Sequence, residues 1–104
     1  MAEILKAGAV YQLHGKVDNL RTASALADPD EELPSVFGTP FMIADIERAC
    51  AALLAPVLED GQVCLGARIE VSHTAPTPVG SNVIAIATFV ERDGPLYWFD
   101  VQAE

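Results

Sequence analysis

The chain has 104 residues, of which 51% are hydrophobic, so it is long enough for one domain with a substantial core and too short for two. Six basic residues against fifteen acidic ones give a formal net charge of -9. This charge argues against a nucleic-acid partner, because such partners are bound by a basic surface. Burying so much apolar sequence is easier when copies share an interface, which predicts a homodimer or a higher homo-oligomer.

The opening residues MAEILKAGAVYQLHG lack a basic start followed by a long apolar run. We therefore expect no secretory signal, no membrane partner and a cytoplasmic location. Cys50 and Cys64 could pair, but a reducing compartment makes free buried thiols the expectation. The sequence has no motif with metal-ligand spacing, so no metal site is predicted.

The first third of the chain is predicted to hold a strand around residues 9–13 and then a long connection. Residues 17–35 are polar and contain the run DPDEE, which is typical of a loop or of short helical pieces. Loops of this length are uncommon in compact domains and often cover a site. A lid is therefore one interpretation of this segment, and a disordered insert is the other.

A core-facing helix is predicted from Pro40 to about Leu58, beginning at the pair Thr39-Pro40. Pro56 should loosen or bend its last turn, because proline cannot donate the helical hydrogen bond. The helical prediction rests on apolar residues that recur at a spacing of three or four: Met42, Ile46, Ala49, Leu53 and Val57, with Ile43, Cys50 and Leu54 beside them.

Strands are predicted over residues 63–73, 82–91 and 96–101. The first follows the Asp60-Gly61 turn and alternates apolar and polar residues, with His73 in phase with its apolar face. The other two are joined by a predicted hairpin turn at Arg92-Asp93-Gly94. One helix with at least four strands, antiparallel where hairpins connect them, predicts a single α+β domain over residues 1–104.

Three side chains able to support acyl transfer lie on the helix and the strand that follows it. Thr39 fits a helix N-cap, but a hydroxyl there also lies where backbone N–H groups favour developing negative charge. Glu47 is either an ordinary boundary residue, paired with Arg48 or Lys16, or a functional group that acts as a general base or orients water. His73 is either a core histidine bonded to a carbonyl group or a proton shuttle.

Residues 33–103 contain the pieces VFGTPFMIADIERACAALLAP and GQVCLGARIEVSHTAPTPVG, followed by a hairpin to Tyr97-Trp98-Phe99. This order resembles the hotdog-fold thioesterases and, within them, the fluoroacetyl-CoA thioesterase-like family. The resemblance implies an antiparallel sheet wrapped around one long central helix, in a homodimer with sites at the subunit interface. It also implies hydrolysis of a small acyl-CoA, with coenzyme A as part of the substrate and no other cofactor.

The resemblance places the catalytic set on Thr39, Glu47 and His73. It places a glycine near the scissile carbonyl on Gly66, although a glycine within a strand can serve close packing alone. Leu33 and Phe37 fall in the lid. Family members selective for fluoroacetate carry an aromatic gate where this chain has Leu33, so a more general short-chain or aromatic acyl group is expected.

Relatives continue with one further strand beyond the position of Glu104, so this chain is expected to lack the family's last strand and its substrate-binding arginine. That expectation keeps an alternative function open. The domain would then be a non-catalytic hotdog module that binds an acyl thioester or a small apolar ligand, or a dimerisation unit. In a third interpretation, all three candidate catalytic residues are structural and the pocket is filled.

Overall fold

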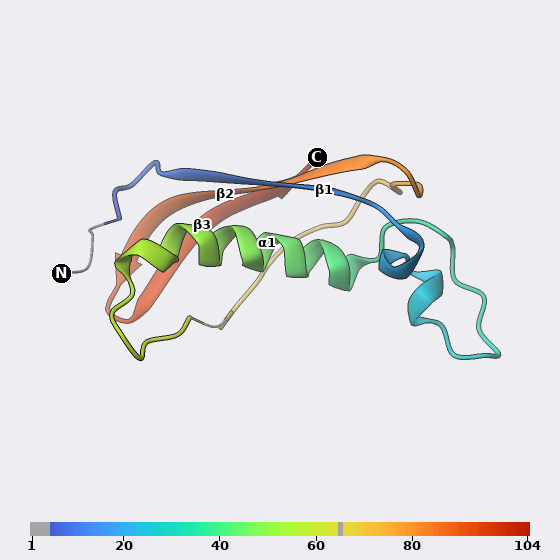
Figure 1. The fold of residues 1–104 in the computed structure, drawn as a ribbon, viewed down its shortest axis with the longest axis horizontal. Coiled ribbons are helices and arrows are strands. Elements are labelled where there is room, and N and C mark those ends of the chain that lie inside the picture. Colours follow the sequence, from blue (N-terminus) through green and yellow to red (C-terminus); the bar gives the residue numbers. More distant parts are fainter. Residues whose placement is uncertain (1–4, 65) are drawn as a thin grey trace.

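The computed structural model describes residues 5–64 and 66–104. Its strands are β1 (Val10–Lys16), β2 (Asn82–Asp93) and β3 (Leu96–Ala103), which form one antiparallel sheet in the order β1-β2-β3. Helix α1 (Thr39–Leu54) lies across one face of this sheet (Figure 1). The predicted α+β class is confirmed. The loop before α1 contains two short 3-10 helices, η1 (Asn19–Arg21) and η2 (Ser24–Leu26), as the polar composition predicted.

Helix α1 begins one residue earlier than a Thr39 cap would require. Gly38 is the N-cap, with extended backbone, and Thr39 is the first helical residue, followed by Pro40 in the first turn. The prediction that Thr39 caps the helix is therefore wrong, and its hydroxyl is free for another partner. At the other end, α1 gives way to a 3-10 turn, η3 (Ala55–Val57), which confirms the loosening expected at Pro56.

The core lies between α1 and the inner face of the sheet. Three alanines are among its most buried residues, since Ala49 of α1 and Ala87 of β2 have no exposed surface and Ala85 of β2 is 2% exposed. Side chains this small let the helix axis lie near the strands. The larger members of the buried cluster are Val17, Phe37, Met42, Ile46 and Val83.

The β2–β3 hairpin turns two residues after the predicted position. Asp93 pairs with Leu96, so Gly94 and Pro95 make the turn, and Gly94 has a φ of 59°, which glycine adopts without strain. The register shifts between Phe89 and Glu91, where an irregularity lets the long strand bend.

The predicted strand over residues 63–73 is wrong. Among its described residues, 63–64 and 66–73, the chain has no strand pairing and runs in the same direction as β3 (Figure 1). Alternating side chains predict an extended backbone, but a strand also needs a neighbouring edge for its N–H and C=O groups. Instead, a groove of about 300 Å³ is lined by Glu70–Ser72 on one side, by Val101–Ala103 of β3 on the other and by Met42 and Ile46 of α1.

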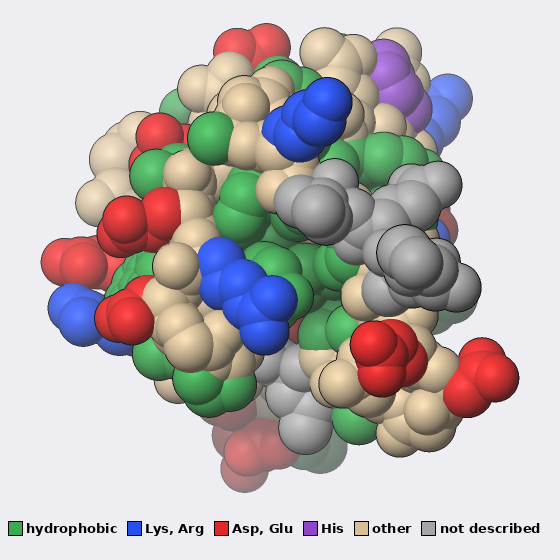
Figure 2. Space-filling view, turned by 90° about the vertical axis from the view of Figure 1, so that its left-hand side faces the viewer, with side chains coloured by type: hydrophobic (Ala, Val, Ile, Leu, Met, Phe, Trp, Pro, Cys, Tyr) green, Lys and Arg blue, Asp and Glu red, His purple; other side chains and the backbone are tan. Residues whose placement is uncertain are grey.

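Hydrophobic side chains also reach the surface of the molecule. Figure 2 views the end where α1 finishes and the β2–β3 hairpin turns, and it shows apolar side chains among charged ones. Val63 is 80% exposed and Trp98 is 38% exposed. None of the described helices is long and apolar enough to cross a membrane.

Candidate functional site

Thr39 and His73 meet at the start of α1. The Thr39 hydroxyl oxygen, Oγ1, lies 2.6 Å from Nδ1 of the His73 imidazole, although the two residues are 34 positions apart. Thr39 is exposed and His73 is half-buried. The sequence placed both residues among the candidates, and the structure brings them into hydrogen-bond contact, which is the geometry of a hydroxyl beside its base.

Backbone contacts fix this pair from both sides. The short segment Val36–Gly38 leads directly into Thr39, and Phe37 N–H donates to the Thr77 carbonyl at 2.7 Å. Val36 also forms an isolated antiparallel bridge with Pro78. Because Thr77 and Pro78 follow His73 closely, the same bridge sets both members of the hydrogen bond.

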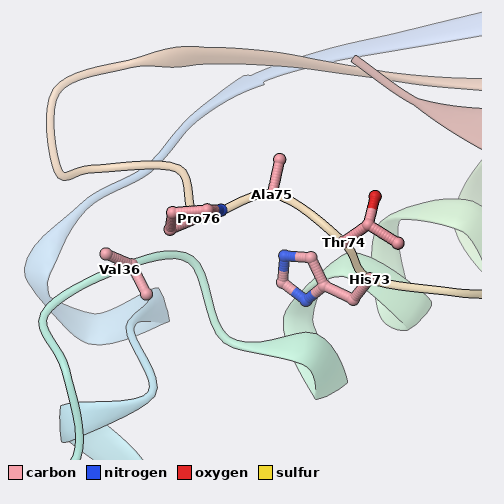
Figure 3. A pocket seen from close by; sticks show the side chains of 5 residues that line it. All are labelled: Val36, His73, Thr74, Ala75 and Pro76. Atoms are coloured by element: carbon pink, nitrogen blue, oxygen red, sulfur yellow. The ribbon is translucent and has the colours of Figure 1, made fainter.

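An open depression of about 230 Å³ lies beside the imidazole (Figure 3). Val36 stands on one side and the run from His73 to Pro76 forms the other, with the imidazole turned into the space between them. Val36, Ala75 and Pro76 give it apolar surface. A depression of this size and lining suits a small acyl group next to a proton acceptor.

The first turn of α1 offers few free donors. Pro40 has no N–H, while Phe41 and Met42 donate theirs to the Gly38 carbonyl at 3.0 and 3.1 Å. Among the described contacts of this turn, the Thr39 N–H has no acceptor within the chain, so it can donate a hydrogen bond to a ligand. That N–H lies at the positive end of the helix dipole, where a developing oxyanion is stabilised.

Glu47 lies apart from this pair within one chain. It is exposed, and it stands eight residues after Thr39, or about 12 Å further along the helix axis. The described contacts include no hydrogen bond from Glu47 to Thr39 or His73, nor the alternative ion pairs with Lys16 or Arg48. The structure thus brings together two of the three candidates and leaves the third on the next part of the helix.

Gly66 lies against Glu47 rather than near Thr39. A Cβ built on Gly66 would stand 2.8 Å from Oε1 and 3.1 Å from Cδ of Glu47. The absence of a side chain at Gly66 therefore makes room for this carboxylate. Its predicted role near the scissile carbonyl stays a prediction, tied now to the position of Glu47.

Cys50 and Cys64 are free thiols, as predicted, and both are half-buried. Burial raises the pKa of the Cys50 thiol from 9.0 to about 11, with smaller contributions from the charges of Glu47 and Cys64. The Cys50 thiol is therefore held in its neutral form beside Glu47.

The two predicted lid residues lie in different surroundings. Phe37 is 3% exposed and belongs to the core, where it anchors the segment before Thr39. Leu33 is 42% exposed in the loop before α1. A lid in this loop stays a prediction that concerns Leu33 and its exposed neighbours, because Phe37 is buried in the core.

An ion pair beside the site escaped the sequence analysis. Asp45 is only 8% exposed, and its carboxylate binds the guanidinium of Arg21. The signal was present in the sequence: Asp45 stands three residues after Met42 and four before Ala49, in phase with the apolar stripe. A buried carboxylate at such a position requires a partner, which the loop before α1 supplies.

The fold is that of the hotdog-like proteins. The solved structure of the fluoroacetyl-CoA thioesterase FlK superposes with a TM-score of 0.93 at 33% identity, covering 98% of this chain and 78% of that one. A hot-dog-like protein from Thermanaerovibrio acidaminovorans superposes with a TM-score of 0.81 at 21% identity, over 94% of this chain and 70% of that one.

Sequence similarity narrows this class to one family. Residues 17–104 match the family model described as fluoroacetyl-CoA-specific thioesterase, and the chain belongs to that family. The fluoroacetyl-CoA thioesterase of Streptantibioticus cattleyicolor is 44% identical over 63 residues, which are 61% of this chain and 45% of that relative. The match with this relative thus spans about half of its length.

Proposed function

We propose that this protein hydrolyses the thioester bond of a small acyl-CoA. The contact of 2.6 Å between the Thr39 hydroxyl and His73 Nδ1 is the observation that carries this proposal. An imidazole beside a hydroxyl, next to an apolar depression and a helix N-terminus, supplies a proton acceptor, an oxygen to be activated and a donor for an oxyanion.

The reaction consumes one water and releases a carboxylic acid and a thiol. His73 accepts the proton of the attacking oxygen, which is either the Thr39 hydroxyl or a water held by it. The new C–O bond forms as the carbonyl oxygen takes up negative charge near the Thr39 N–H, and the C–S bond then breaks. The leaving thiolate takes the proton from the imidazolium. Where Thr39 is the attacking oxygen, a water deprotonated by His73 then hydrolyses the Thr39 ester, which releases the carboxylic acid and restores the hydroxyl.

Glu47 joins this site from a second copy of the chain in the proposed assembly. It is exposed in the single chain, and its distance along α1 from Thr39 separates it from the imidazole of its own chain. The single chain also has a radius of gyration of 15.5 Å, against about 13 Å for a compact domain of this length. This extended shape and the exposed apolar side chains support a homodimer whose interface completes the site.

The first test is the release of free thiol from acetyl-, fluoroacetyl-, isobutyryl- and benzoyl-CoA by the wild type and by His73→Ala and Glu47→Ala. We expect turnover to fall by at least about a hundredfold in each variant, as for loss of an acid–base group. Circular dichroism and sedimentation would show that the variants remain folded. Near-normal turnover in both folded variants would remove the proposed mechanism.

Mixing the two inactive variants tests the shared site. In a mixed dimer, one site combines intact Thr39 and His73 from one chain with intact Glu47 from the other. After random exchange of subunits, about a quarter of wild-type turnover should return, because half of the dimers are mixed and each has one complete site. If turnover did not return in a mixture whose subunits had been shown to exchange, the site would lie within one chain.

A binding module without catalysis is the second candidate, and the distance of Glu47 from His73 in one chain favours it. In that case an acyl-CoA would raise the thermal midpoint of the wild type without any release of thiol. Thiol release that requires His73 would exclude this candidate.

A further inference from the structure

The side chain of Arg21 connects three parts of the molecule. Its guanidinium binds the carboxylate of Asp45 on α1 and donates to the carbonyl of Lys16, at the end of β1, at 3.3 Å. The central carbon of the guanidinium, Cζ, lies 5.0 Å from the centre of the Phe37 ring. The side chain is 24% exposed, so these contacts are largely shielded from water.

The backbone around Arg21 holds the segment that leads into the candidate site. The Arg21 carbonyl accepts from Gly38 N–H at 3.0 Å, and Ala23 N–H donates to the Val36 carbonyl at 2.8 Å. Val36–Gly38 is thus bound to the loop before α1 on one side, while Thr77 and Pro78 bind it on the other.

These contacts form a closed ring of interactions that joins the first turns of α1 to the loop before it. Thr39 is connected to Asp45 through α1, Asp45 to Arg21 through the ion pair, and Arg21 back to Gly38 through the backbone hydrogen bond. The ion pair and the backbone hydrogen bond together fix the start of the helix relative to the loop more tightly than either contact would alone. Removing the charge of Arg21 or of Asp45 would leave the other charged group shielded from water and without its partner.

We propose that Arg21 and Asp45 are a positioning pair for the Thr39–His73 hydrogen bond. This inference rests on the proposed function, because it assigns the pair to the alignment of that site. The pair touches neither Thr39 nor the pocket directly, and it acts through Val36–Gly38. A small displacement of that segment would lengthen the hydroxyl–imidazole contact and move the Val36 wall of the pocket.

The test compares Arg21→Gln and Asp45→Asn with the control Arg48→Gln. Arg48 also approaches Asp45, at 3.7 Å, but its side chain is 68% exposed, so its loss should change little. Each variant is assayed for kcat and KM with its best acyl-CoA, and the ring nitrogens of His73 are followed by NMR without substrate. We expect kcat to fall by about tenfold or more in the two test variants, with a smaller change in KM and shifted His73 signals.

The double variant provides a check that the two residues act as one unit. If they do, Arg21→Gln with Asp45→Asn should lower kcat no further than the worse single variant. Should either single variant fail to fold, Arg21→Lys keeps the charge but loses the planar group that makes three contacts, and it should show the same loss of kcat.

Two results would overturn the inference. One is unchanged His73 signals in folded test variants; the other is a lowered thermal midpoint with unchanged kcat, which would make the pair merely structural. If the wild type released no thiol at all, the proposed function would fail while the NMR comparison still decided whether the pair positions His73.

Discussion

Replacing Gly66 is expected to lower turnover while leaving the stability of the fold nearly unchanged. A methyl group there would approach the carboxylate of Glu47 to within 2.8 Å, but this carboxylate is the exposed end of a flexible side chain and can move away. Gly66→Ala should therefore change the thermal midpoint little while lowering turnover by roughly tenfold, because Glu47 is displaced. In a Glu47→Ala background, Gly66→Ala should have no further effect on turnover. A further loss there would show that Gly66 affects turnover independently of Glu47.

Cys50 gives a prediction about pH. Its pKa is raised in the folded state by burial, so the folded protein holds the thiol proton more tightly than the unfolded chain does. The resulting stability is complete below pH 9 and is lost as the pH rises toward about 11. Urea denaturation should show a smaller loss of stability over this interval in Cys50→Ala than in the wild type. Equal losses in the two proteins would contradict the assignment.

At the scale of elements, local patterns predicted α1 and the three strands of the sheet within a few residues. The same patterns failed for residues 63–73, because side-chain alternation reports an extended backbone and says nothing about a neighbouring edge. Thr39 and His73 were found as candidates by residue type, whereas Arg21 and Asp45 were missed because their partnership depends on how a long loop folds back onto α1. Glu47 was assigned to the same site, which the resemblance locates at a subunit interface, and the rise of the helix separates it from Thr39 within one chain.

Hydrogen exchange tests this difference between elements. Amides of β2 are bonded to strands on both sides and should exchange slowest. Amides of residues 66–73 have no strand partner in the described structure and should exchange much faster, by at least about a hundredfold. Equal protection of both segments at low protein concentration would show that residues 66–73 are paired in solution.

At the scale of the whole molecule, β3 leaves one edge of the described sheet open. Glu104 and Ile84 exchange both backbone hydrogen bonds, so the N–H and C=O groups of Ala103 and Val101 point the other way, toward the groove. Open edges of this kind can pair with another extended chain. Proline at position 103 would remove one outward N–H without breaking a bond to β2.

Solubility as a function of acidity follows from this open edge. At neutral pH the net charge of -9 makes copies repel one another, which opposes pairing between their edges. Near the isoelectric point of about 4.4 that repulsion disappears, and turbidity should rise with protein concentration. Ala103→Pro should remain clearer than Ala103→Val under the same conditions, and equal turbidity would locate the association elsewhere. For storage, we therefore expect this protein to stay dispersed in buffers well above its isoelectric point of about 4.4.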